Sequence, residues 1–186
     1  MSAITDLQRI GIKLFTEEFS VDQQDFIGVF HRWIQEQSVQ DHLLVDVADY
    51  SHVRNGPGIL LVSHEANINS DETDGRPGLQ YLRKQPLSGS FGERLGSVLH
   101  TAIVAAQRLE GEPELSGRLR FSRDEFLFIA NDRLLAPNTD ATFEALNAAV
   151  SESLRQHCSV VAIATSRCAD DKGLLRIGVR GDGILA

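Results

Sequence analysis

The chain has 186 residues, of which 42% are hydrophobic and 24% charged, and this balance fits one compact domain spanning residues 1–186 with a core of ordinary size. Its formal net charge of -8 at pH 7 opposes sequence-independent binding to nucleic acid, because such binding needs a concentrated positive surface. We therefore expect no nucleic-acid partner.

The N-terminal sequence and the cysteines bear on the compartment. The sequence MSAITDLQRIGIKLF lacks a basic start followed by a long apolar stretch, and no apolar run is long enough to cross a bilayer. The two cysteines, Cys158 and Cys168, form neither a disulfide framework nor a Cys-x-x-Cys pair. These features predict a soluble cytoplasmic protein without membrane contact, whose cysteines are reduced and structural.

The first predicted elements are a strand, a helix and a hairpin. Apolar residues alternate over 9–16, which is typical of a strand. A helix follows Asp22, because apolar residues recur there at intervals of three and four. Its buried side consists of Phe26, Val29, Phe30, Trp33 and Ile34. The segments 43–53 and 59–66 alternate again, and Asn55-Gly56 between them is a favoured hairpin turn.

Two further helices are predicted from their caps and apolar stripes. Ser90 is a good N-cap with Glu93 as its capping-box partner, and Gly111 ends the helix that follows. The last helix starts with Asn138 or Thr139 as its cap. The two buried stripes are Phe91, Leu95, Val98, Ala102, Ile103 and Leu109, and then Phe143, Leu146, Val150 and Leu154.

The remaining elements are strands, and together with the helices they indicate the fold class. They are expected at residues 79–85, 118–122, 125–130, 159–166 and 174–180. The last four would form two hairpins, around Ser122-Arg123-Asp124 and through Asp170-Asp171-Lys172-Gly173. This order of strand-helix-hairpin units predicts an α+β fold, a two-layer sandwich in which three amphipathic helices cover one face of a mostly antiparallel sheet.

The hairpin of residues 43–66 concentrates the side chains that could bind a ligand. These are Asp46, Tyr50, His52, His64 and Glu65. With Val53 opposite Ile59, His64 has Asp46 and Tyr50 as diagonal neighbours at about 7 Å. The opposite face is apolar and is predicted to lie under the helices; it consists of Val45, Val47, Val53, Ile59 and Leu61. The face of His64 is expected to be a pocket or an interface.

Metal chemistry has little support. In the predicted register His52 lies on the order of 13 Å from His64, so the two imidazoles cannot share one ion. The polar segment 67–75 does not place glycine and glutamate where an EF-hand needs them, which favours a solvated acidic turn over a cation site. The polar groups of the hairpin are either a hydrogen-bonded structural patch or a ligand site.

No Gly-rich phosphate loop or Gly-x-Ser-x-Gly motif is present, so no cofactor or reaction is indicated. We predict a non-catalytic domain that binds a small ligand or a protein partner. A homodimer is expected because a strand ending in Arg176-Ile177-Gly178-Val179 would leave an edge that needs covering. The alternative is a small metal- or acid/base-dependent enzyme using Asp46, His64 and Glu65, since catalytic sites gather ionisable groups.

Overall fold

A computed structural model describes residues 3–157, 162–168 and 173–185 of the chain. Its α-helices are α1 (Asp25–Glu36), α2 (Phe91–Gly111) and α3 (Asp140–His157), and short 3-10 turns lie at η1 (Ala3–Asp6) and η2 (Thr73–Gly75). The strands are β1 (Ile10–Phe19), β2 (Leu44–Tyr50), β3 (Gly58–Ser63), β4 (Ala66–Asp71), β5 (Gly78–Arg83), β6 (Leu119–Ala130), β7 (Ala164–Arg167) and β8 (Leu175–Arg180).

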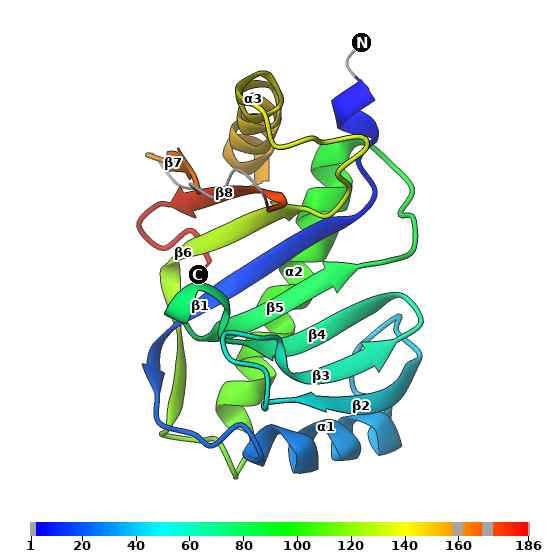
Figure 1. Ribbon diagram of the computed structural model, residues 1–186, viewed down its shortest axis with the longest axis vertical. Helices are drawn as coiled ribbons and strands as arrows, with labels where there is room; N and C mark the ends of the chain where they lie inside the picture. The colour runs from blue at the N-terminus through cyan, green and yellow to red at the C-terminus, as the bar shows by residue number, and fades with distance from the viewer. Residues whose placement is uncertain (1–2, 158–161, 169–172, 186) are drawn as a thin grey trace.

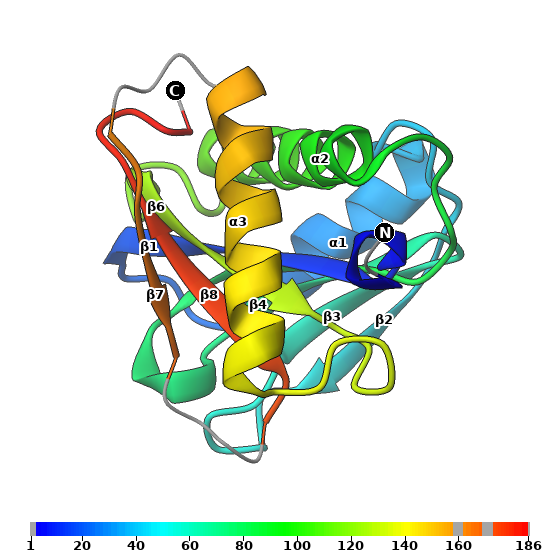
Figure 2. The same cartoon turned by 90° about the horizontal axis from the view of Figure 1, so that it is seen from above.

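The strands form one antiparallel sheet in the order β2-β3-β4-β5-β1-β6-β8-β7 (Figure 1). α1 packs against β2 and β3, α2 crosses β1, β5 and β6, and α3 lies beside α2 over β7 and β8 (Figure 2). No α-helix of the described residues covers the opposite side, the helix-free face, which is turned toward the viewer in Figure 1. The α+β sandwich with helices on one face is therefore confirmed.

The three predicted helices are present, and their predicted stripes face the core, although Ile34, Ile103 and Phe143 are only partly buried. α1 buries Phe26, Val29, Phe30 and Trp33. Ser90 caps α2 in a capping box with Glu93, and the helix ends at Gly111 as expected. Thr139 caps α3, because its Oγ1 accepts a hydrogen bond from the N–H of Thr142 at 3.3 Å. In the described part of the chain, none of the helices is both long and apolar enough to span a membrane.

The strand predictions were wrong at two places. Residues 66–71, predicted as part of a polar loop, form the inner strand β4, in which Asn69, Ser70 and Asp71 are buried. Residues 119–130 form the single strand β6 instead of a hairpin around Ser122-Arg123-Asp124. β6 follows β1 through register shifts near Thr16, so the sheet accommodates the polar residues by bulging rather than by turning back.

The C-terminal hairpin is present where the structure describes it. β7 pairs antiparallel with β8, as predicted for the segments 159–166 and 174–180. Residues 158–161, which include Cys158, and residues 169–172, which include all of the predicted turn 170–173 except Gly173, lie outside the described residues.

The β2–β3 hairpin has a different register from the one predicted. Asp49, not Val53, lies opposite Ile59, because residues 51–57 form a longer connection than a two-residue turn. The shift is an even number of residues, so Val47 and Leu61 still face the helices as predicted. A bulge between Leu44 and Asp46 reverses the alternation at the start of β2.

Because of this bulge, the prediction that Val45 belongs to the core was wrong. Leu44 is buried in the main core, whereas Val45, predicted to lie under the helices, is 58% exposed. Val53 lies in the connection after β2 and is also exposed.

The edge strands are β2 and β7. β8 lies between β6 and β7, so the predicted free edge at Arg176–Val179 was wrong. On β2 the side-chain amide of Gln37 makes two hydrogen bonds with Leu44, accepting from its N–H and donating to its C=O, both at 3.0 Å. The N–H of Val47 donates to Asp46 Oδ1 at 2.8 Å. Side chains thus occupy part of the hydrogen-bonding edge of β2.

Candidate functional site

The predicted site residues on β2 lie near water. Asp46 and Tyr50 are exposed, and the Asp46 carboxylate is engaged by the N–H of Val47. His52 follows the end of β2, and its ring stacks on Tyr50 with centroids 6.4 Å apart. Asp46 lies opposite Val62 in the sheet.

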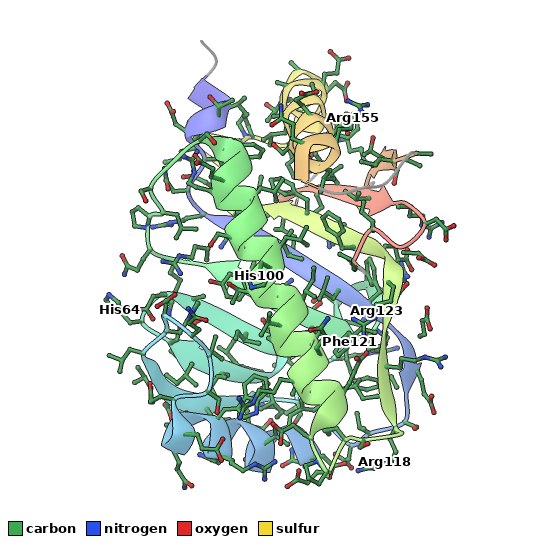
Figure 3. The ribbon with its side chains drawn as sticks, turned by 180° about the vertical axis from the view of Figure 1, so that it is seen from behind. His64, His100, Arg118, Phe121, Arg123 and Arg155 are labelled. Carbon is green, nitrogen blue, oxygen red and sulfur yellow. The ribbon has the colours of Figure 1, made fainter. Side chains whose placement is uncertain are left out.

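His64 and Glu65 lie at the end of the hairpin. The N–H of His64 donates to the C=O of Leu43 at 2.9 Å, so His64 does not lie opposite Ala48 as predicted. Its side chain is exposed at the rim of the sheet (Figure 3). The Glu65 carboxylate accepts from the N–H of Leu43 at 2.8 Å. Among the described residues no hydrogen bond or ion pair joins the Asp46 side chain to His64 or Glu65. Burial alone would raise the pKa of Glu65, but the hydrogen bond from Leu43 and the nearby His64 help to lower it.

The acidic segment 67–75 does not form an open turn. Asp71 ends β4 as a buried carboxylate paired with a lysine, and residues 73–75 form η2. Among the described residues, no three His, Cys, Asp or Glu side chains are arranged to hold a metal ion.

The pairing register places one row of residues straight across the helix-free face. From β2 to β7 these are Ala48, Leu60, Asn69, Gln80, Lys13, Leu127, Gly178 and Ser166. The residues in the middle of the row are polar, and those at the β7 end have small side chains or none. Lys13 places a charged group on the inner strand β1, and Gly178 lies two strands away on β8, on the far side of Leu127.

A small apolar cluster lies on this face, separate from the main core. Phe15, Leu127 and Ile129 are its buried members. Partly buried Leu82, Cys168 and Leu174 pack against it. Burial raises the pKa of the Cys168 thiol, so this cysteine is packed as an apolar group and is not activated as a nucleophile.

A buried ion pair lies next to the apolar cluster. Lys13 Nζ donates to Asp71 Oδ2 at 2.5 Å and to the C=O of Thr73 at 3.0 Å, and the two charged side chains are only 3% and 2% exposed. Thr73 completes the group, because its Oγ1 donates to Asp71 Oδ1 at 2.7 Å. Burial lowers the pKa of Lys13, and the attraction of Asp71 offsets this only in part.

Two arginines share one carboxylate at the border of the cluster. Arg76 Nη2 lies 2.5 Å from Glu125 Oε1, and Arg180 Nε lies 3.0 Å from Glu125 Oε2. The Arg76 guanidinium also stacks over the Phe15 ring, 3.7 Å from its centroid. Burial alone would raise the pKa of Glu125, but the hydrogen bonds from Arg76 and Arg180 outweigh it and lower that pKa.

Two neighbouring hollows open over these groups. They measure about 380 and 400 Å³, and both are lined by Phe15, Arg76, Leu127 and Cys168. Glu125, Gly178 and Arg180 line the first hollow, and Lys13 and the ion pair of Arg176 with Asp74 border the second. An apolar floor with charged groups at its margin can hold a small molecule and orient its polar end.

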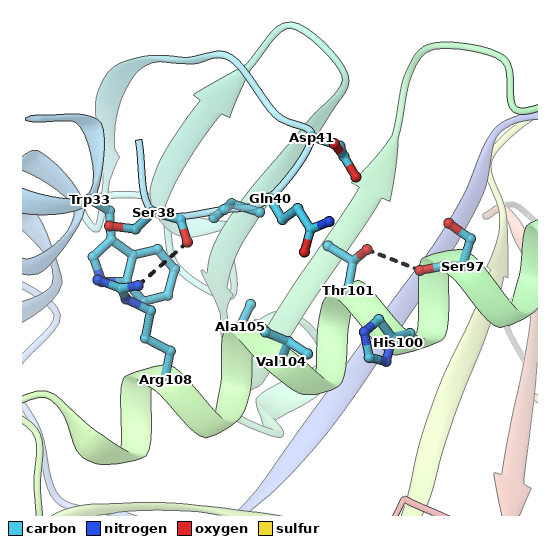
Figure 4. Close-up of a pocket in the computed structure, with 11 residues that line it drawn as sticks. Trp33, Ser38, Gln40, Asp41, Ser97, His100, Thr101, Val104, Ala105 and Arg108 are labelled. Atoms are coloured by element: carbon cyan, nitrogen blue, oxygen red, sulfur yellow. Dashed lines mark hydrogen bonds between the residues drawn. The ribbon is translucent and has the colours of Figure 1, made fainter. Parts of the chain in front are cut away.

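A third hollow, of about 220 Å³, lies on the helix side between α2 and the loop after α1 (Figure 4). Arg108 at its border is 5.4 Å from the Trp33 ring centroid and donates to Glu36 at 2.9 Å. His100 lies on the outward side of α2 (Figures 3 and 4). This hollow is smaller, and its arginine is already engaged by Trp33 and Glu36.

The residues around the open hollows were missed by the sequence analysis. The alternation IGIKLF indicated β1 correctly, yet Lys13 and Phe15 fall on the side opposite Ile12 and Leu14. This alternation along β1 was the feature of the sequence that could have placed Lys13 and Phe15 on the face away from the core. The partners Asp71, Arg76, Glu125 and Arg180 come from distant segments, and no local pattern connects them.

Comparison with known proteins adds no functional assignment. No protein-family model matches the chain, and no curated protein is significantly similar to it in sequence.

Proposed function

We propose that this protein is a non-catalytic binding domain whose small ligand occupies the hollows on the helix-free face. The observation that carries the proposal is the cluster of Phe15, Leu127 and Ile129, which lies apart from the main core and of which Phe15 and Leu127 line two hollows. A sheet with helices on one side does not need such a cluster for its core, whereas a ligand with an apolar body does need a floor of this kind.

The proposed ligand site lies on the same face of the sheet as the predicted one, but over other strands. The hairpin of β2 and β3 contributes Leu60 and Val62 to the helix-free face, but the hollows lie over β1, β6 and β8. The ligand-binding role of Asp46, Tyr50, His52, His64 and Glu65 stays a prediction that the observed geometry does not favour. The enzyme alternative, which uses Asp46, His64 and Glu65, likewise stays a prediction.

Filling the hollow tests the proposal. Gly178 lines it, and a Cβ built there would lie 3.0 Å from Ser166 Oγ, so Gly178→Val places two methyl groups in the space with a small adjustment. The neutral dye Nile red, whose emission rises in apolar surroundings, serves as the probe. Ala48→Val is the matched control, because it enlarges a residue of the same row at the far end of the sheet.

We expect wild type and Ala48→Val to bind the dye alike, and Gly178→Val to bind it several-fold more weakly. Circular dichroism and thermal unfolding confirm that each variant is folded. Absence of binding to wild type, or equal binding by Gly178→Val, would refute a ligand site in this hollow.

The homodimer and the cytoplasmic location stay predictions, each with its own measurement. A homodimer can no longer be argued from β8, which is an inner strand, and light scattering at micromolar concentration measures the state directly. The cytoplasmic location stays a prediction, to be checked by fractionation of cells that make the full chain.

A further inference from the structure

We infer that the ligand of the helix-free face is a free organic anion, with its carboxylate or phosphate group held by Arg76 and Arg180 and its apolar body lying on the cluster of Phe15 and Leu127. This inference rests on the proposed function, because it names the ligand class for the same hollows. It predicts that charge, not only apolar area, decides which molecules bind.

The first support is the way in which Glu125 holds the two guanidinium groups. One carboxylate receives Arg76 on Oε1 and Arg180 on Oε2, so the two cations are fixed beside each other. Two positive charges against one negative charge leave a local excess of one positive charge in a chain whose formal net charge is -8. An anion at this point therefore meets a local attraction, although the chain as a whole is negatively charged.

The second support is that both arginines keep donors for a ligand. A guanidinium carries five N–H groups. Within the described residues, Glu125 takes Arg76 Nη2 and Arg180 Nε, and the other nitrogens of these two side chains make no hydrogen bond. The side chains are 47% and 71% exposed, so these N–H groups are open to solvent and can be presented in pairs to a carboxylate or phosphate.

The third support is the fixed orientation of Arg76. Its guanidinium lies over the Phe15 ring, with 3.7 Å between the Cζ atom and the ring centroid. A stacked guanidinium donates along its edge, in its own plane, and cannot turn away without losing this contact. The anionic group would sit at that edge, while the chain or ring attached to it covers Leu127 beside Gly178.

Arg176 is a different case and is not part of the proposed anion site. It pairs with Asp74 at 2.5 Å, and its side chain is only 14% exposed. Lys13 is likewise neutralised by Asp71 and buried. The anion specificity is therefore assigned to Arg76 and Arg180 alone.

The test compares two probes that differ only in the head group. Decanoate carries a carboxylate, and decanol carries a hydroxyl on the same chain. Displacement of Nile red by each probe is measured for wild type, Arg76→Gln, Arg180→Gln and the double variant. Arg120→Gln is the matched control, because Arg120 also lies on a strand of this sheet, is 63% exposed and pairs with one carboxylate, that of Glu17 at 3.1 Å.

We expect decanoate to bind wild type about tenfold more tightly than decanol, because its carboxylate can accept charge-assisted hydrogen bonds from both arginines and the decanol hydroxyl cannot. Arg180→Gln should reduce decanoate affinity about tenfold, and the double variant should bind the two probes equally. Arg120→Gln should behave as wild type. The preference for decanoate should also fall as salt is raised, because the arginines are partly exposed.

The outcomes separate the inference from the proposed function. If Nile red binds in the Gly178-dependent way but decanoate affinity is unchanged in the double variant, the hollow is a ligand site and the anion inference is wrong. If Nile red does not bind wild type, the proposed function itself fails. Binding to vesicles of anionic phospholipid in the absence of any decanoate binding would overturn the free small-molecule source in favour of a lipid surface.

Discussion

The buried pair of Lys13 and Asp71 makes the largest single-residue prediction. Replacing Asp71 with Asn leaves the ammonium group of Lys13 without its carboxylate in a place where both side chains are almost fully buried. An uncompensated buried charge costs about 3–5 kcal/mol. We expect Asp71→Asn to lower the free energy of unfolding by an amount in that range.

The reverse substitution should cost less. In Lys13→Met the carboxylate of Asp71 still accepts hydrogen bonds from the N–H of Thr73 at 3.2 Å and from its Oγ1 at 2.7 Å. The double variant Lys13→Met/Asp71→Asn contains no unpaired charge, so it should recover much of the loss seen in Asp71→Asn. The interaction free energy from this cycle should fall in the upper part of the range of about 0.5–3 kcal/mol seen for contacting residues.

The same pair sets a pH dependence. Burial lowers the pKa of Lys13 below its ordinary value of 10.5, so between these two pKa values the unfolded state binds more protons than the folded state. Stability from this group therefore rises with pH in that window and is lowest below it. Asp71→Asn removes the attraction that raises the Lys13 pKa, so in this variant the pKa of Lys13 in the folded state is lower than in wild type. The stability of the variant therefore begins to rise at a lower pH. As pH rises from the folded-state pKa of the variant to that of wild type, the difference in stability between the two proteins becomes smaller.

The free energy of unfolding of wild type, the two single variants and the double variant is measured by urea titration. The fluorescence of Trp33 reports unfolding, because it is the single tryptophan of the chain and is fully buried. A loss below about 1 kcal/mol in Asp71→Asn, the range of exposed ion pairs, together with no change in pH dependence, would refute the argument from burial.

Three smaller predictions use the same titration. Leu61→Ala should cost about 2–5 kcal/mol because Leu61 is fully buried, whereas Val45→Ala should change stability by less than about 0.5 kcal/mol; equal losses would contradict the observed bulge. Ser90→Ala should cost about 1 kcal/mol through loss of the α2 cap, and no loss would mean that the capping box is not formed in solution. Gly58→Ala should cost more than about 1–2 kcal/mol, because Gly58 has φ +64 and an added Cβ would lie 2.1 Å from the C=O of Ser70; a neutral result would contradict that close approach.

Local patterns were sufficient to predict the helices. The capping box of Ser90 and Glu93 and the spacing of Phe26, Val29, Phe30 and Trp33 depend only on residues within a few turns of each other. The same holds for the side of β1 that faces the core. The fold class followed because amphipathic helices and alternating strands leave few ways to bury their apolar sides.

Strand β4 and the candidate site could not be found in this way. The sequence ANINSD has only two apolar residues, Ala66 and Ile68, which pack in the main core. Its polar residues are buried through distant partners: Asp71 pairs with Lys13, and the hydroxyl of Ser70 donates to Gln23 and accepts from the N–H of Ile59, across 58, 47 and 11 residues of the chain. Such pairs are set by the tertiary fold. The bulge at Val45 was also missed, and no local pattern marks it: Leu44 beside it is held by the side-chain amide of Gln37, seven residues earlier.

The contact between Gln37 and Leu44 also bears on how copies of this protein behave at high concentration. The exposed apolar side chains of Leu43 and Val45 lie at an outer strand, a combination that favours sheet extension from one molecule to the next. An incoming strand would have to break both bonds of the Gln37 amide before making its own with Leu44, so it gains no net hydrogen bond at that position. The amide thus adds to the exposed carboxylates of Asp46 and Asp49 on β2, since it occupies both main-chain groups of Leu44 that an incoming strand would need.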